Sequence, residues 1–335
     1  MSLPQGEVEV DATVDQSQRL LTDEPGTIEG RSLGRIAWTR LKRDKVALGG
    51  GVIVVIVVFV AIFAPVLCAL YGQSPYAPHY GLISLDTNFP LGRFGGVSRY
   101  HWLGVEPTDG RDILARLMYG ARTSIIVGFC ATFLSLIIGV TLGVLAGYYR
   151  GSADAVISRI MDVILSFPTL LFALAVLAIF SNVPTFLGLS GQPLRYVLII
   201  FLLGFFGSPV IGRIVRGQVL SLREKEFVEA ARSLGASDYR IVTRELLPNL
   251  VGPILVYTTL YVPTNILGEA GYSFLGVGFQ PPTASWGQML SDATKGMQVD
   301  PFYLFCPGIA IFITVLAFNL FGDGLRDALD PKSSR

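Results

Sequence analysis

Residues 226–249 read EFVEAARSLGASDYRIVTRELLPN, a polar stretch between two strongly apolar segments. An ordinary connection between membrane helices would be short or featureless, whereas this pattern predicts two helices with a break. Residues 224–234 contain good helix formers with acids near the start, and Gly235 can adopt the positive φ that ends a helix.

The second predicted helix begins after Ser237 or Asp238, either of which can cap it. It runs to about Leu247, where Pro248 is expected to stop it. The residues alone leave two interpretations open. The loop is either amphipathic and lies on a membrane surface, or it is a surface that another protein approaches closely, with small residues at the bend.

The composition predicts a membrane protein. The 335 residues are 51% hydrophobic and 15% charged, with a mean hydropathy of +0.56, whereas soluble proteins carry about 25% charged residues. A bilayer span needs roughly 20 mostly apolar residues. Six stretches meet that length, at residues 46–71, 124–148, 160–181, 194–215, 251–270 and 303–321. We therefore expect an all-α polytopic protein with six transmembrane helices, of which prolines interrupt the fourth and fifth.

Lysine and arginine predict the orientation, because cytoplasmic flanks carry the excess of basic residues. Of the 26 basic residues, 19 lie in residues 1–45, 149–159, 213–250 and 323–335. Both termini and the 226–249 loop are therefore predicted to be cytoplasmic, and residues 72–123 and 271–302 to lie on the outer side.

The chain is predicted to have five parts. They are a disordered acidic cytoplasmic tail (1–30), an interfacial helix and first span (31–71), an extracytoplasmic segment (72–123), a five-helix core that contains the cytoplasmic loop 224–249 (124–322), and a cytoplasmic tail (323–335). The first tail carries seven acids and one arginine without an apolar core, which is typical of disorder. Trp38 and the cations around it suit an interfacial helix.

Disulfide, metal and enzyme chemistry are not predicted. Cys68, Cys130 and Cys306 lie in apolar spans, and an odd buried set argues against a disulfide framework. His79 and His101 lie outside the spans without ligand spacing. The sequence has no Gly-Lys pair, hence no phosphate-binding loop, and no Ser/His/Asp set. We therefore expect no ATP hydrolysis by this chain, no enzyme activity and no cofactor in it.

The polar stretch also carries a family pattern. Glu229-Ala230-Ala231, then Gly235, then Leu247-Pro248, resembles the "EAA" cytoplasmic loop of the membrane permeases of ABC importers. In that family the loop docks into a groove on an ATP-hydrolysing subunit and transmits its closure to the pore. The coupling residues that the resemblance implies are Glu229, Ala230, Ala231, Gly235, Ala236, Leu247 and Pro248.

Other stretches resemble the C-type permease of dipeptide and oligopeptide importers, so that the resemblance extends from about Trp38 to Asp330. They are residues 38–45, 110–124, 267–278 and 285–287. One departure is the spacing between Leu103-Gly104 and Gly110, which is five residues where the family pattern has four.

The resemblance implies the type I ABC importer permease fold in a bacterial inner membrane. It also implies partners: a second, homologous permease, two ATP-binding cassette subunits that bind ATP and Mg, and an extracytoplasmic substrate-binding protein. No nucleic acid is expected. The implied mechanism is alternating access, in which ATP binding closes the ATPase dimer and opens the permease pair outward.

Residues 267–278 resemble the outer gate region of that family. Glu269 is the one acid at the end of an apolar span, and such residues are functional candidates. Its carboxylate either meets the amino group of a peptide or caps backbone amides at the bend. The candidates for the translocation path or gate are Glu269, Asn265, Tyr272 and Phe274.

Two further patterns predict packing. Small residues recur at four-residue spacing in the second span, and we expect a seam within the chain rather than against a partner. They are Ala131, Ser135, Gly139, Gly143 and Gly147. Arg159 and Asp162 lie three apart on a predicted helix and are expected to pair.

Rival functions remain open at this stage. Similar permeases carry nickel, glutathione or haem, because the binding protein mostly chooses the substrate. An ion-gradient-driven secondary transporter is the rival from another class. Such transporters place ionisable groups near the bilayer midplane, and no predicted span here has a charge near its middle.

Overall fold

The computed structural model describes residues 38–92, 94–181, 183–298 and 301–329. The predicted disordered tail, most of the predicted interfacial helix and the end of the C-terminal tail lie outside these residues. Within them, one helical turn ends at Leu41, which packs against Ala47 and Ala328. Lys42 lies over the Trp38 ring at 5.1 Å.

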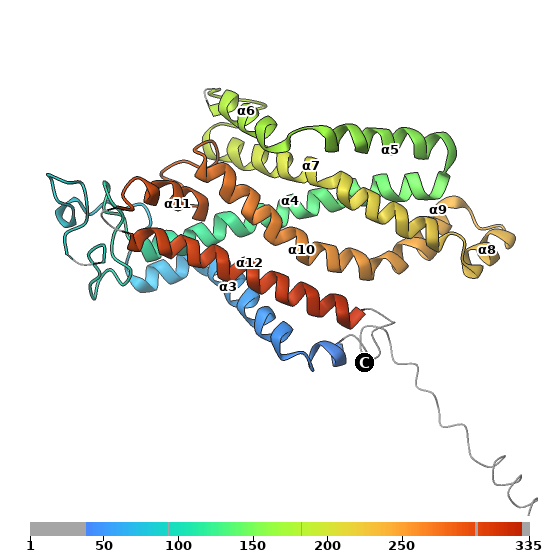
Figure 1. Ribbon diagram of the computed structural model, residues 1–335, viewed down its shortest axis with the longest axis horizontal. Coiled ribbons are helices and arrows are strands. Elements are labelled where there is room, and N and C mark those ends of the chain that lie inside the picture. The colour runs from blue at the N-terminus through green and yellow to red at the C-terminus, as the bar shows by residue number, and fades with distance from the viewer. Residues whose placement is uncertain (1–37, 93, 182, 299–300, 330–335) are drawn as a thin grey trace, which may run out of the picture.

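Long helices run roughly side by side in one bundle (Figure 1). They are α3 (Lys45–Tyr71), α4 (Ile113–Tyr149), α7 (Gly191–Leu222), α10 (Leu247–Phe274) and α12 (Phe302–Leu329). All five belong to helical stretches that are long and apolar enough to cross a membrane, and the bent pair α5 (Gly151–Ser166) and α6 (Thr169–Ser181) makes a sixth when it is counted as one span. This arrangement confirms the predicted fold class. Shorter elements lie at the two ends: η1 (Tyr80–Leu82) and α11 (Trp286–Thr294) at one, α8 (Glu226–Ser233), α9 (Asp238–Arg240) and η2 (Ile241–Leu246) at the other.

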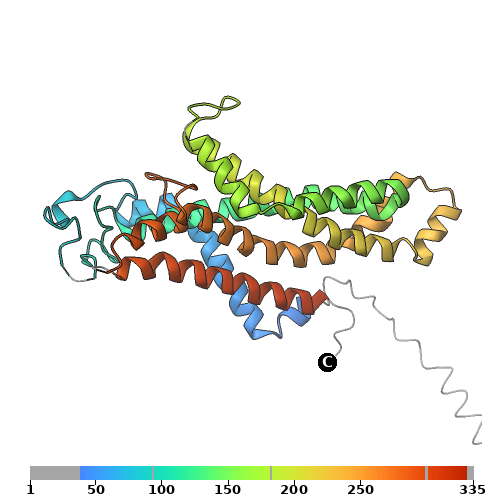
Figure 2. The ribbon, with the colours of Figure 1, turned by 45° about the horizontal axis from the view of Figure 1, so that its top comes forward.

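The third span differs from the prediction of one helix over residues 160–181. The chain begins α5 at Gly151, breaks at Phe167-Pro168, and continues as α6 at 73° to α5. Phe167 is extended, with φ −71° and ψ 135°, which is the conformation that a following proline favours. As a result, α6 leans out of the bundle (Figure 2). Pro209, by contrast, lies inside the continuous helix α7.

The line of small residues in α4 packs against α7, as predicted for a seam within one chain. Gly143 lies so close to α7 that an added Cβ would be 2.5 Å from the Gly212 carbonyl oxygen. Gly139 and Gly147 make equally close approaches, to Ser208 and Val219. Any larger side chain in this row would push the two helices apart.

Ion pairs join α5 to α7, and they correct the predicted partner of Asp162. Asp162 pairs with Arg213 of α7 rather than with Arg159 of its own helix. About two turns of α5 nearer its start, Asp154 accepts two hydrogen bonds from Arg216, at 2.5 and 2.7 Å. The bend between α5 and α6 leaves α5 alongside α7, so a pairing across helices wins over the local one.

The segment before α4 folds over one end of the bundle together with α11. We call residues 72–112 and α11 the outer cap, after the side of the membrane that the basic residues predict for them. Glu106 lies at its centre and is only 2% exposed. It pairs with Arg111 and, at 2.8 Å, with Arg116. Tyr303 of α12 donates to the same carboxylate at 3.2 Å. Burial raises the pKa of Glu106, and Arg116 and Arg111 oppose that shift.

Asp112 ties a second set of groups in the outer cap together. It is fully buried and caps α4 by accepting from the Ala115 amide at 2.8 Å. It also accepts from the Tyr71 hydroxyl at 3.0 Å and lies 2.8 Å from His101 Nδ1. This carboxylate therefore joins the end of α3, the outer cap and the start of α4.

Candidate functional site

The polar loop between α7 and α10 forms the predicted helix, break and second helix. α8 ends at Ser233, and Gly235 has the predicted left-handed conformation, with φ +79°. Ser237 then caps α9 by accepting from the Arg240 amide. We call residues 224–249 the inner loop, since it lies at the end of the bundle opposite the outer cap (Figure 1).

The prediction that Pro248 stops the second helix is wrong. The chain passes from α9 through the π-helical turn η2 directly into α10, and helix continues from Asp238 to Phe274. Pro248 is the second residue of α10, and α10 follows directly on that π-helical turn. The wider π turn immediately before it changes the hydrogen-bond register there. The inner loop is thus a direct extension of a membrane helix.

Buried side chains hold the inner loop on the ends of α4 and α7. Val228, Ile241 and Leu246 are fully buried in a cluster that includes Val219 of α7. The hydroxyl of Tyr148, near the end of α4, donates to Asp238 at 2.6 Å. The loop is therefore fixed to the bundle at several points.

The opposite face of the inner loop carries side chains that nothing in this chain covers. Glu229 and Ala230 are exposed, and within the described residues Glu229 forms no ion pair. Leu234 is 88% exposed and Tyr239 is 78% exposed. No atom lies within 4 Å of a Cβ built at Gly235. A bulky residue there would have room in this chain alone.

The other predicted coupling residues divide between the two faces. Ala231, Ala236 and Leu247 are half-buried and pack against the cluster beneath the loop. Pro248 is exposed. Sequence reasoning missed Leu234 and Tyr239, although large apolar side chains beside a glycine break in a polar loop are themselves a signal of a contact surface.

Glu269 lies in the interior of the chain. It is fully buried and accepts from the hydroxyls of Ser124 and Ser273, each at 2.7 Å. Ser273 in turn accepts from the Phe279 amide at 3.0 Å. In this structure the carboxylate therefore connects α10 to α4 and, through Ser273, to the segment after α10. Its partners are hydroxyls rather than the backbone amides of the bend.

The remaining path candidates are not gathered on one surface. Asn265 is buried and donates to Thr132 of α4 at 2.9 Å. Tyr272 is buried in a cluster with Phe279, whereas Phe274 is 43% exposed. Three of the four candidates thus contribute to packing in this conformation. Their part in a translocation path stays a prediction.

Two family descriptions match the chain. Residues 139–335 match the binding-protein-dependent transport system inner membrane component. Residues 32–90 match the N-terminal TM domain of oligopeptide transport permease C. The two matches leave residues 1–31 and 91–138 uncovered, and the second gap includes the first part of α4.

Individual relatives match over almost the whole chain. A dipeptide transport system permease protein DppC of Alkalihalophilus pseudofirmus is 41% identical over 95% of this chain and 98% of its own length. A glutathione transport system permease protein GsiD of Pectobacterium atrosepticum is 40% identical over 90% of this chain and 92% of its own length.

Solved structures share the fold. Two inward-facing structures of the MetNI methionine ABC transporter superpose with TM-scores of 0.50 and 0.52, at 22% and 19% identity. Each match covers 65% of this chain and 98% of the solved one. The arrangement of helices is therefore that of an ABC importer permease.

Proposed function

We propose that this chain, which belongs to the family of binding-protein-dependent transport system inner membrane components, carries di- or oligopeptides across the membrane as one half of a permease pair. It is a multi-pass permease of an ABC importer. The peptide substrate is the proposal, and the DppC relative at 41% identity supports it.

The exposed face of the inner loop supports a second part of the proposal, that the chain binds ATPase subunits. Glu229, Ala230, Leu234 and Tyr239 are displayed on a loop that is itself fixed to the bundle. A rigid loop with uncovered apolar side chains suits a permanent protein partner. The partner ATPases bind ATP and Mg, and this chain supplies the surface that their closure moves.

The other partners follow from the same class of transporter. They are a second, homologous permease that completes the path and a substrate-binding protein on the outer side. The excess of basic residues supports a cytoplasmic location for both termini and the inner loop, in a bacterial inner membrane.

Glutathione is the second candidate substrate, because the GsiD relative is nearly as similar as the DppC relative. Glutathione is itself a small peptide, so the two candidates share the same chemistry. Nickel and haem have no comparable support among these relatives.

Reconstitution of the whole importer tests the substrate. The permease pair, the ATPases and the binding protein are placed in liposomes, and ATPase rate and uptake are measured with dipeptides, longer peptides, glutathione, nickel and haem. We expect peptides or glutathione to stimulate both rates. Stimulation by haem or nickel alone would contradict the proposal.

Single cysteines test the orientation. Ser237→Cys in the inner loop and Ser291→Cys in α11, each with the native cysteines replaced, are expected to react with an impermeant thiol reagent from opposite faces of the membrane. Labelling of both from the same face would contradict the scheme, because α10 would then not cross.

Glu269→Gln tests whether the buried carboxylate serves the substrate. If it meets the peptide amino group in another conformation, uptake of free peptides falls more than uptake of N-acetylated ones. Equal losses for both kinds of peptide indicate that Glu269 only ties α10 to α4. Unchanged uptake of both with normal assembly removes it from the path.

A further inference from the structure

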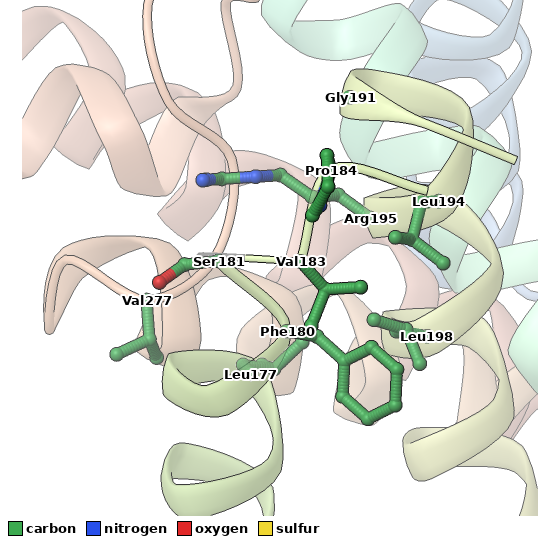
Figure 3. A pocket seen from close by; sticks show the side chains of 10 residues that line it. All are labelled: Leu177, Phe180, Ser181, Val183, Pro184, Gly191, Leu194, Arg195, Leu198 and Val277. Carbon is green, nitrogen blue, oxygen red and sulfur yellow. The ribbon is translucent and has the colours of Figure 1, made fainter. Parts of the chain in front are cut away.

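A pocket of about 220 Å³ opens between α6, the start of α7 and the segment that follows α10 (Figure 3). Five apolar side chains line it, those of Leu177, Phe180, Leu194, Leu198 and Val277, together with Ser181 and Arg195. Helix α6, which forms one side of the pocket, lies nearer to the end of the bundle that carries the outer cap than to the inner loop (Figure 1).

Arg195 is the one charged residue in this wall. Its side chain extends from α7 towards the segment that carries Val277 (Figure 3), and Nη1 donates to the Gly278 carbonyl at 2.6 Å. Among the residues that the structure describes, no acidic side chain forms an ion pair with Arg195. A half-buried guanidinium in apolar surroundings is costly unless an anion accompanies it.

The geometry points to Arg195 as the binding site for the carboxylate of the last residue of a transported peptide. This inference rests on the proposed peptide substrate. Arginine binds a carboxylate through two parallel N–H donors, and one bond to Gly278 leaves enough donors for that pairing. The apolar wall beneath would then receive the side chain of the same peptide residue.

The size of the pocket favours a small carboxylate over a membrane lipid. A volume of about 220 Å³ suits a carboxylate with one side chain better than a long acyl chain. An acyl chain is better matched by a groove of about 410 Å³ at the outer end of α3, lined by Leu67, Leu70 and Met118.

A binding measurement tests whether the pocket recognises the free carboxylate of a peptide. The assembled permease–ATPase complex is placed in nanodiscs without binding protein, and the affinities of the dipeptide Ala-Phe and of its C-terminal amide are measured. Wild type is expected to bind the free acid about tenfold more tightly, which corresponds to 1.4 kcal/mol. Arg195→Gln is expected to abolish this preference, and Arg195→Lys to retain part of it.

Arg122→Gln is the matched control, because Arg122 is an exposed arginine in the outer part of α4 and does not line the pocket. It is expected to keep the tenfold preference. Equal or absent binding of both peptides by wild type would overturn the inference, and so would an undiminished preference in Arg195→Gln. Loss of co-purified phosphatidylglycerol from Arg195→Gln, with peptide binding unchanged, would overturn it in favour of a lipid.

The proposed function fails separately from this inference. If the complete importer takes up peptides and Arg195→Gln binds as wild type does, only the assignment of Arg195 falls. If no peptide stimulates the complete wild-type importer, the peptide substrate itself is wrong.

Discussion

The outer cap and the inner loop differ in how far their key side chains are buried. In the outer cap, Glu106 and Asp112 are buried and bind neighbouring groups, among them Arg116 at the start of α4. In the inner loop, Glu229 is exposed, and Leu234 and Tyr239 expose most of their surface beside it. The outer cap pairs its buried carboxylates within the chain, whereas the inner loop exposes the side chains that we propose to contact another protein.

Because of this difference, we expect substitutions in the outer cap and in the inner loop to have different effects. Changes in the outer cap should reduce the stability of the chain itself, since they remove partners that the chain supplies. Changes on the exposed face of the inner loop should leave the chain intact and affect only its assembly.

The largest effect is expected from Glu106→Ala in the outer cap. The change leaves the fully buried guanidinium of Arg116 without its carboxylate, and breaking a buried pair in this way costs about 3–5 kcal/mol. The purified complex should melt at a clearly lower temperature or fail to assemble. Arg150→Ala is the control, because its pair with Glu224 is about half exposed and should be worth at most about 1 kcal/mol. Equal melting temperatures for the two variants would contradict the contrast between the ends.

A smaller effect on the fold, with a large effect on assembly, is expected from Gly235→Asp. Gly235 and Gly188 share a φ of +79°, and neither has an atom within 4 Å of a built Cβ. Aspartate should therefore cost each site about 1 kcal/mol of backbone strain. Only Gly235→Asp should reduce co-purification of the ATPases or uncouple hydrolysis from transport, because only Gly235 lies on the inner loop.

Two other variants extend this test of the inner loop. Ala230→Trp would obstruct the approach of a partner, and Glu229→Lys would reverse an exposed charge. Both should leave the permease pair formed and weaken ATPase binding. Normal association and normal peptide-stimulated transport in all three loop variants would rule out this surface as the docking site.

The smallest effect is expected from Tyr148→Phe, which removes one anchor of the inner loop. The lost hydrogen bond to Asp238 should cost about 1 kcal/mol. Amide hydrogen exchange across residues 226–246 should accelerate, and stimulated ATPase activity should fall modestly. Tyr149→Phe is the control, because Tyr149 is the next residue along the chain and its side chain is 54% exposed. Equal exchange in the two variants would show that apolar packing alone holds the loop.

The sequence predicted features that depend on neighbouring residues along the chain. The left-handed Gly235, the cap at Ser237 and the run of apolar spans follow from local chemistry. The seam along α4 was also predictable, since glycine at four-residue spacing marks one helix face.

Features that depend on distant residues were not predictable. Pro168 breaks a span while Pro209 does not, because surrounding helices decide whether a freed backbone group is satisfied. Asp162 pairs with Arg213, a residue 51 positions away, and not with Arg159 in the preceding turn of its own helix. Glu269 meets Ser124 across 145 positions, and no local pattern indicates that contact.

Helix α4 joins the two ends that differ so strongly. It begins at the carboxylate of Asp112 in the outer cap and ends beside Tyr148, which holds the inner loop. Its 37 residues contain no proline, whereas α3, α7, α10 and α12 each contain at least one. At 1.5 Å per residue it measures about 55 Å. One proline-free helix therefore connects the residue that anchors the outer cap to the residue that anchors the inner loop, so both ends share a single covalent and hydrogen-bonded element.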